Sequence, residues 1–222
     1  MAELIYLDLG CVGYDSALQD QHRLVERVRQ AVEEKAYLLL VEHVPPVITI
    51  GRSGRAEHIL VSADQLAAEG IEIHKTTRGG DVTYHGPGQL VAYPILRLDL
   101  HGRDVHRYLR DIEGAVIRLL GKFDIEGRRR KGYTGVWVGE EKIAAIGVAV
   151  RRWVTYHGLA LNVSPDLSHF EFIVPCGIRG KRATSLARLL GRPVLISEVK
   201  PLLIECIVEA FGFRGAREET LQ

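Results

Sequence analysis

The chain has 222 residues, of which 46% are hydrophobic and 26% are charged, and its formal net charge is +1. This length and composition allow a sizeable buried core, and we expect one main domain. A net charge so close to zero gives no general case for binding nucleic acid. The first ten residues contain neither a basic segment nor a long apolar one, so we expect no secretory signal, no membrane span and a cytoplasmic location.

The first quarter of the chain begins with a strand and a helix. Residues 3–9 are strand-like, and apolar residues at helical spacing predict an amphipathic helix from about 14 to 35. Val32 is among the residues that we expect this helix to bury. Two further strands are predicted over 37–41 and 47–50, and we expect them to pair with each other.

The middle of the chain continues this alternation. Short strands are predicted over 71–75 and 90–98, where apolar runs are bounded by turn residues. Helices are predicted over 62–69 and over about 104–122, and each begins with a serine or aspartate that can cap a helix N terminus.

The next region favours strands again. Residues 126–132 have the composition of a turn, and apolar segments on both sides of residues 139–141 predict a β-hairpin. The hairpin places Lys142 immediately after its turn. Another strand is predicted over 155–163. Strands before, between and after helices predict an α/β or α+β fold class.

Residues 78–89, RGGDVTYHGPGQ, form a polar, glycine-rich block between two apolar, strand-like segments. Glycines let the main chain approach a bound group closely. The donors and acceptors of the block are Arg78, Asp81, Thr83, Tyr84, His85 and Gln89. We interpret the block as a loop shaped around a ligand. From these residues alone, a hairpin with turn glycines and a buried structural histidine is an equal alternative.

Cys176 lies in a Pro-Cys-Gly turn, and three cations follow it before a helix start expected at Thr184 or Ser185. Nearby cations and helix N termini stabilise the thiolate, which is the nucleophilic form of cysteine. A free cysteine in an arbitrary setting is more often a small buried hydrophobe. Here the turn and the flanking charges favour a reactive cysteine.

The other two cysteines differ from Cys176. Cys206 lies on the apolar stripe of a predicted helix, and we expect it in the core. Cys11 has no basic neighbours, and we expect it to be a packed small residue. An odd number of cysteines without C-x-x-C spacing favours a reducing compartment and argues against a zinc site. The nine histidines are scattered, so we expect no metal.

Three segments, taken in order, resemble one enzyme family. They are RGGDVTYHGPGQLVAYPI at 78–95, GEEKIAAIGVAVRRWVTYHGLALNV at 139–163 and FIVPCGI at 172–178, and together they closely resemble lipoyl(octanoyl) transferase, the octanoyltransferase of protein lipoylation. The resemblance covers essentially the whole chain, residues 1–222, as one catalytic domain. It implies the fold of the catalytic domain of biotin and lipoate protein ligases, with an acyl tunnel across a mixed sheet flanked by helices.

The resemblance also implies a reaction. Cys176 would attack the thioester of octanoyl-acyl carrier protein to form an acyl-enzyme. A lysine of a lipoyl domain, in 2-oxoacid dehydrogenase complexes or in the glycine cleavage H protein, would then take the octanoyl group as an amide. Lys142 matches the family's catalytic lysine, which lowers the pKa of the thiol and shuttles protons. The reaction implies no nucleotide, metal or other cofactor.

The family's substrate-binding residues, carried over position by position, fall in three stretches that should line the acyl pocket. They are Arg78, Gly79, Gly80, Asp81, Val82, Thr83, Tyr84, His85, Ala145, Ile146, Gly147, Gly158, Leu159 and Ala160. His85 is expected to position the thioester or to order the cysteine loop, and it is assigned no proton transfer.

Two other functions stay open at this point. An ATP-dependent lipoate or biotin protein ligase of the same fold would activate a free acid and need no nucleophilic cysteine. A non-catalytic acyl-binding module would use the pocket without needing Cys176 and Lys142. The basic run at 128–131 suggests a docking site for the acidic carrier protein, although a solvated loop tip explains it as well.

Overall fold

A computed structural model describes residues 2–174 and 182–220. Its main element is an eight-stranded sheet in the order β11-β1-β2-β6-β10-β9-β8-β7, and a second sheet has the order β4-β3-β5. The strands of the large sheet are β1 (Leu4–Val12), β2 (Ala36–His43), β6 (Gln89–Ile95), β7 (Arg128–Arg130), β8 (Tyr133–Val138), β9 (Glu141–Arg151), β10 (Val154–Asn162) and β11 (Ala216–Glu218). Those of the small sheet are β3 (Val47–Ile50), β4 (Glu72–Lys75) and β5 (Val82–His85).

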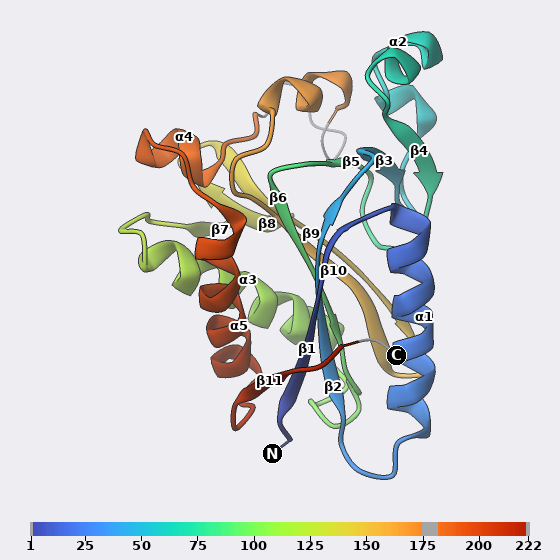
Figure 1. The fold of residues 1–222 in the computed structure, drawn as a ribbon, viewed down its shortest axis with the longest axis vertical. Coiled ribbons are helices and arrows are strands. Elements are labelled where there is room, and N and C mark those ends of the chain that lie inside the picture. The colour runs from blue at the N-terminus through green and yellow to red at the C-terminus, as the bar shows by residue number, and fades with distance from the viewer. Residues whose placement is uncertain (1, 175–181, 221–222) are drawn as a thin grey trace.

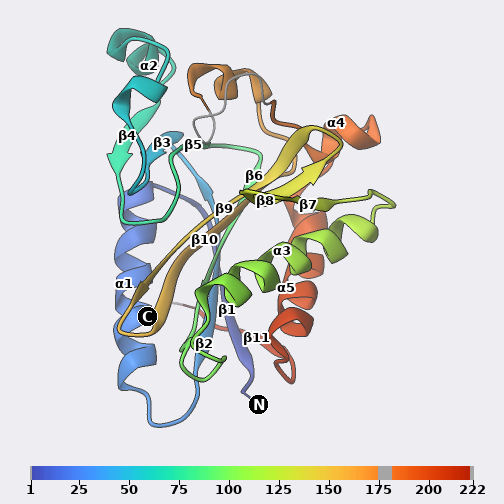
Figure 2. The same cartoon turned by 180° about the vertical axis from the view of Figure 1, so that it is seen from behind.

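Helices cover both faces of the large sheet, as Figures 1 and 2 show. Helix α1 lies on one face, and α3 and α5 lie on the other. The helices are α1 (Tyr14–Gln30), α2 (Ala63–Ala68), α3 (Val105–Gly121), α4 (Leu186–Leu190) and α5 (Ile196–Phe211), with 3₁₀ turns at Ala56–His58 and Leu167–Phe172. The sheet is mixed, because β1 pairs in parallel with β2 and β11, while all other neighbouring strands of the sheet pair antiparallel. The predicted α/β class, a mixed sheet flanked by helices, is confirmed.

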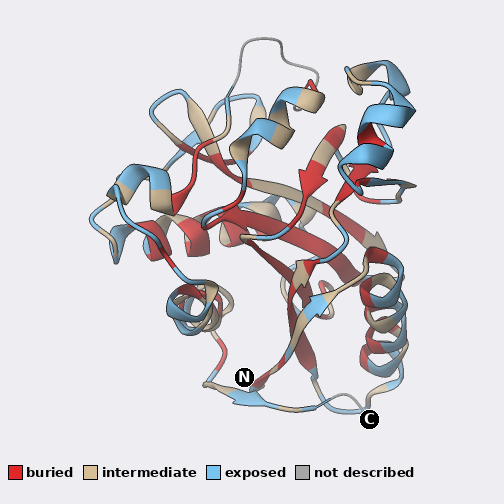
Figure 3. Cartoon of the chain, turned by 45° about the horizontal axis from the view of Figure 1, so that its top comes forward, coloured by how far each residue is buried: buried red, intermediate tan, exposed pale blue. Residues whose placement is uncertain are grey.

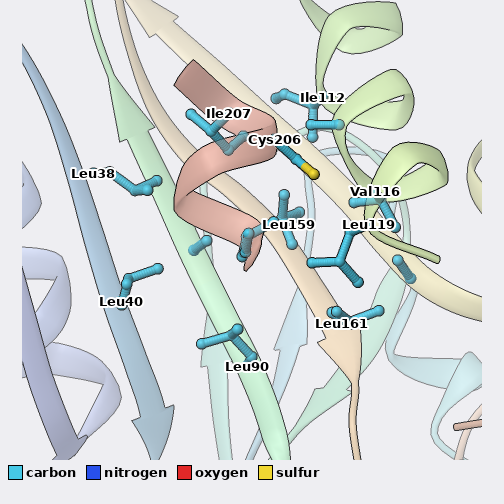
Figure 4. Packing of buried hydrophobic residues seen from close by; sticks show 14 of the residues in the cluster. Leu38, Leu40, Leu90, Ile112, Val116, Leu119, Leu159, Leu161, Cys206 and Ile207 are labelled. Atoms are coloured by element: carbon cyan, nitrogen blue, oxygen red, sulfur yellow. The ribbon is translucent and has the colours of Figure 1, made fainter. Parts of the chain in front are cut away.

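The core has one layer on each side of this sheet. Figure 3 shows the central strands almost wholly buried, while the outer faces of the helices are exposed. On the side of α3 and α5, Cys206 packs among Ile112, Val116 and Leu159 (Figure 4). Full burial of a side chain of the size of leucine contributes about 1.5–3 kcal/mol. Cys206 is fully buried in this layer, so its prediction as a core residue is confirmed.

The local signals in the sequence predicted several elements well. The side chain of Ser62 accepts a hydrogen bond from Gln65 in a capping box at the start of α2, and Asp104 caps α3 through two backbone N–H groups. Ser185 caps α4, which agrees with the helix start expected at Thr184 or Ser185. The hairpin of β8 and β9 turns at Gly139, as predicted.

Two predictions about the N-terminal part were wrong. The first helix ends at Gln30 instead of about residue 35, and Val32 is fully exposed. Glu33 and Glu34 would have placed two negative charges at the negative end of the helix dipole, which disfavours a longer helix. Cys11 is exposed and not packed. A register shift between Asp8 and Gly10 separates it from the buried alternation at the start of β1.

Three further predictions were wrong about pairing and loops. Strands β2 and β3 do not pair, since β2 lies between β1 and β6 and β3 lies between β4 and β5. The glycine-rich block includes β5 and is not a loop throughout. Part of the basic run forms the edge strand β7. Within residues 2–174 and 182–220, no helix is long and apolar enough to cross a membrane.

Candidate active site

A cavity lies between the large sheet and the glycine-rich block. It brings together Lys142, the stretches 145–147 on β9 and 158–160 on β10, and the block itself at 78–83 and His85. These segments are far apart in the sequence, and the antiparallel pairing of β9 with β10 sets two of them side by side. The predicted substrate-binding stretches therefore surround one space.

Tyr84 is the predicted site residue that the structure places elsewhere. Its side chain is buried in the small core beneath β3 and β5, where its ring lies 5.5 Å from that of Phe170. Successive side chains of a strand point to opposite faces. Because Thr83 and His85 line the cavity, Tyr84 between them faces away from it. Burial raises the pKa of its phenol to about 12.

Small residues on the sheet make room for the block to approach. A Cβ atom added at Gly147 would lie 2.8 Å from the carbonyl oxygen of Gly79 and 3.2 Å from Cδ of Arg78. The backbone N–H of Gly79 donates to the carbonyl of Val148 at 2.9 Å. The block is thus seated directly on β9, and the small side chains of Ala145 and Ala160 leave space in the cavity.

Arg78 braces the block from the other side. Its side chain is buried, and Nη2 donates to the carbonyl and hydroxyl oxygens of Thr49 at 2.7 and 2.8 Å. Nη1 donates to the carbonyl of Gly79 at 3.0 Å. The guanidinium therefore ties the block to β3, and it brings a positive charge to the cavity wall.

Lys142 stands on β9 at the rim of the cavity. Its Nζ donates to the carbonyl of Thr134 at 3.3 Å and lies 4.9 Å from the ring centroid of Trp137. Its backbone N–H donates to the carbonyl of Arg182 at 2.9 Å, and its carbonyl accepts from the N–H of Thr184 at 3.0 Å. The chain just beyond residue 181 is thereby fixed beside Lys142.

Cys176 lies outside the described residues, so its predicted role stays a prediction. The described chain ends before it at Val174, whose N–H donates to the carbonyl of His58 at 2.8 Å. It resumes at Arg182, which lines the cavity together with Ala183. Both flanking points belong to fixed parts of the fold.

A chain of hydrogen bonds connects the glycine-rich block with the segment that follows Cys176. Nδ1 of His85 lies 3.3 Å from Oε1 of Gln89, and Nε2 of Gln89 donates to Oδ1 of Asn162 at 2.9 Å. Nδ2 of Asn162 then donates to the carbonyl of Thr184 at 2.9 Å. His85 is therefore joined to residue 184 through two side-chain amides, and its predicted ordering of the cysteine loop remains a prediction.

Three buried histidines lie at the cavity wall or directly behind it, and burial favours their neutral form. His85 and His157 line the cavity, and the ring of His43 lies 5.8 Å from that of His85. Burial lowers the pKa of His43 to about 4, and burial together with the charge of Arg78 lowers that of His157 to about 3. Burial, with His43 and Arg78 nearby, also lowers the pKa of His85 well below its ordinary value. Burial raises the pKa of Tyr93, whose hydroxyl lies 2.7 Å from Nε2 of His43. These buried histidines and Tyr93 therefore add no charge next to Arg78.

Several residues that line the cavity were not predicted from the sequence. They include Tyr14, Tyr93, Trp137, His157 and Asn162. Tyr14 is the first residue of α1 and contacts the ring of His43, and the other four lie on β6, β8 and β10. Alternation along these strands was a usable signal, because it marks which side chains share one face. Nothing local indicated that α1 would contribute.

The described residues contain no group of three or more histidine, cysteine or acidic side chains placed to hold a metal ion.

The basic run at 128–131 is largely engaged in contacts within the fold. Arg129 forms an ion pair with Glu113 at 3.1 Å, and Arg130 forms one with Glu140 at 2.7 Å. Arg130 also lies over the ring of Trp137 at 5.4 Å.

Residues 13–208 match the family model of the lipoyl protein ligase A/B catalytic domain. The chain belongs to this family. Among its curated relatives, the octanoyltransferase of Solibacter usitatus is 55% identical over 205 residues, covering 92% of this chain and 91% of the relative. The octanoyltransferase of Caldicellulosiruptor saccharolyticus is 47% identical over 221 residues, covering 98% and 92%. The resemblance seen in the sequence is confirmed, and this member of the lipoyl protein ligase A/B family is an acyltransferase.

Solved structures support the fold assignment. The crystal structure of lipoate-protein ligase A bound with ATP superposes with a TM-score of 0.80 at 21% identity, covering all of this chain and 90% of the other. At this identity the likeness concerns the fold alone. The arrangement of sheet and helices described above is therefore that of the lipoyl protein ligase A/B family.

Proposed function

We propose that the chain transfers an octanoyl group from octanoyl-acyl carrier protein to a lysine of a lipoyl domain, through a thioester on Cys176. The observation that carries the proposal is the place of Lys142. It borders the cavity, and its backbone is paired with residues 182–184, which follow Cys176 closely in the chain. The naming of the relatives as octanoyltransferases supports the choice of acyl group.

In the first step, the thiolate of Cys176 attacks the thioester carbonyl of the donor. A new carbon–sulfur bond forms at Cys176, and the bond to the carrier's thiol breaks. An ammonium close to a thiol favours the thiolate, which is the nucleophile. Lys142 can supply that charge and can give its proton to the departing carrier thiolate. The products are the octanoyl-enzyme and the free carrier thiol.

In the second step, the amine of the acceptor lysine attacks the octanoyl-enzyme. An amide bond forms, the bond to Cys176 breaks, and Lys142 in its neutral form takes the proton that the attacking amine loses. Exchange between two thioesters is nearly balanced, whereas transfer from a thioester to an amine is downhill. Neither step therefore requires a nucleotide or another cofactor.

The apolar part of the cavity lining suits an aliphatic chain. The octanoyl chain gains about 0.8 kcal/mol for each buried methylene, so full burial contributes several kcal/mol of binding. The stretches 145–147 and 158–160 offer an apolar wall, and the neutral His85 and His157 add no charge to the cavity. These features favour an aliphatic acyl group over a charged substrate.

The partners follow from the reaction. The donor is octanoyl-acyl carrier protein, and the acceptors are the lipoyl domains of 2-oxoacid dehydrogenase complexes and the glycine cleavage H protein. Because Arg129 and Arg130 are ion-paired within the fold, a docking role for 128–131 would depend mainly on Arg128 and Lys131. That docking role and the cytoplasmic location stay predictions.

Intact-protein mass spectrometry tests the proposal. The chain is mixed with octanoyl-acyl carrier protein without ATP, and wild type is compared with Cys176→Ala, Lys142→Ala and Cys11→Ala. We expect an octanoyl adduct that hydroxylamine removes in wild type and in Cys11→Ala, no adduct in Cys176→Ala, and slow adduct formation in Lys142→Ala. Cys11 is the matched control because its thiol is exposed.

Two other results would contradict the proposal. Acylation of a lipoyl domain from free octanoic acid only when ATP is present would identify an ATP-dependent ligase. Binding of octanoyl-acyl carrier protein without any transfer, with or without ATP, would identify an acyl-binding module.

A further inference from the structure

A buried carboxylate lies outside the cavity, on the far side of β8 from Lys142. Glu113 belongs to α3, and its side chain is fully buried. Its Oε2 accepts from Nη1 of Arg110 at 2.6 Å and from Nε of Arg129 at 3.1 Å. Its Oε1 accepts from the backbone N–H of Gly135 at 3.0 Å. Burying a carboxylate is costly unless charges and hydrogen bonds compensate for lost hydration, and here three donors do so.

One peptide group connects this carboxylate with Lys142. The N–H of Gly135 and the carbonyl of Thr134 belong to the same peptide unit, and Nζ of Lys142 donates to that carbonyl at 3.3 Å. The unit is planar, so its N–H and C=O rotate together and point in opposite directions. The bond to Glu113 at one end therefore sets the direction of the oxygen at the other end.

The backbone around this peptide is shaped to bring Lys142 against it. Gly135 has φ +123°, a conformation open mainly to glycine. A Cβ atom there would lie 2.6 Å from the carbonyl oxygen of Ala144 and 3.4 Å from Cε of Lys142. The pairing of β8 with β9 also shifts register between Val136 and Trp137. Such irregularities re-aim side chains beside functional sites.

We propose that Glu113 is a positioning residue for Lys142. It fixes the Thr134–Gly135 peptide, whose carbonyl oxygen holds the lysine ammonium at the rim of the cavity. An anion at the N–H end also polarises the peptide and strengthens the acceptor at its carbonyl end. The inference rests on the proposed function, since that function gives Lys142 the proton transfers. Glu113 touches neither the cavity nor a reacting atom, so its effect passes through Lys142.

The test compares two substitutions of Glu113 with a control on the same carboxylate. Glu113→Gln keeps the size of the side chain, but an amide cannot accept from Gly135 and from both arginines at once. Glu113→Asp keeps the negative charge, but its shorter side chain moves the carboxylate away from the N–H of Gly135. Arg110→Gln removes a half-exposed partner and leaves the bond to Gly135 in place. Both Glu113 variants are measured so that a folding defect in one does not end the test.

The measurement is a single round of enzyme acylation by octanoyl-acyl carrier protein in excess, without an acceptor lipoyl domain. The final amplitude counts competent sites, and the rate constant reports chemistry at each site. We expect the rate constant to fall about tenfold or more in both Glu113 variants, because a small misplacement of a catalytic group costs up to about a hundredfold. The half-saturating donor concentration should stay within about twofold. Arg110→Gln should keep both quantities within about twofold of wild type.

The possible results distinguish a failure of the positioning role of Glu113 from a failure of the proposed octanoyl transfer. If wild type forms no octanoyl-enzyme, the proposed function fails. If wild type reacts and the Glu113 variants show the same rate constant per site, the positioning role is wrong. A lower amplitude with an unchanged rate constant would assign Glu113 a purely structural role, and would equally overturn the inference.

Discussion

Substitution of Gly147 by alanine tests how the glycine-rich block is seated on the sheet. The new Cβ atom would lie 2.8 Å from the carbonyl oxygen of Gly79 and 3.2 Å from Cδ of Arg78. Ordinary contacts of this kind begin near 3.4 Å, so the block must retreat by about 0.6 Å. The retreat strains the hydrogen bond from Gly79 to Val148. Overpacking of this kind costs about 1–3 kcal/mol of unfolding free energy.

The same shift should reduce activity, because residues 78–83 line the cavity. We expect kcat/KM for octanoyl transfer to fall at least about tenfold, since misplacement by about 1 Å can cost a hundredfold. Urea unfolding and a transfer assay measure the two effects.

Gly121→Ala is the matched control for this substitution. Gly121 is the last residue of α3, and a Cβ atom there would meet nothing within 4 Å. Alanine should stabilise the chain there by about 0.5 kcal/mol, because glycine is the poorer helix former. If Gly147→Ala unfolds and transfers like wild type while Gly121→Ala behaves as expected, the block does not rest on β9 in the way described.

Two further predictions concern buried groups. Burial lowers the pKa of His43 from 6.5 to about 4, so between these pH values the unfolded chain binds a proton at His43 that the folded chain does not. The contribution of neutral His43 to the free energy of unfolding is therefore complete above pH 6.5. It is lost as the pH falls toward 4, at about 1.4 kcal/mol per pH unit. Urea unfolding across this range should show that slope reduced in His43→Gln, and an unchanged slope would refute the assignment. Cys206→Ser buries a hydroxyl, so it should lower the free energy of unfolding by about 1–3 kcal/mol without changing the transfer rate per folded site. Cys11→Ser, at an exposed position, should stay within about 0.5 kcal/mol of wild type. Equal losses of stability in the thermal unfolding of the two variants would contradict this contrast.

The sequence predicted local structure where one side chain decides it. Ser62 and Asp104 cap their helices through hydrogen bonds to residues two or three positions away, and such bonds leave a readable pattern. The pairing of β3 with β4 and β5 depends on contacts across tens of residues. Neighbouring apolar runs carried no sign that β2 would join a different sheet, so proximity in sequence misled the prediction.

The same distinction applies to the site. The motifs predicted the stretches that line the cavity, while the alternation within β5 could have excluded Tyr84. Glu113 was missed although it left a signal. It interrupts the apolar stripe of α3 at a position where Val116 and Leu120 share its face, and a charge there implies a buried partner. Which partner it finds depends on the approach of β7 and β8, which no local pattern reveals.

The two edges of the eight-stranded sheet are short and charged in the described part of the chain. β7 and β11 have three residues each, with an all-arginine sequence in β7 and Arg217 and Glu218 in β11. Exposed edges can template the addition of strands from other molecules, and charged side chains on brief edge strands oppose this. The arginines of β7 thus have a second consequence besides any contact with a carrier protein. They discourage folded copies from polymerising edge to edge, so their replacement by apolar residues bears on aggregation as much as on catalysis.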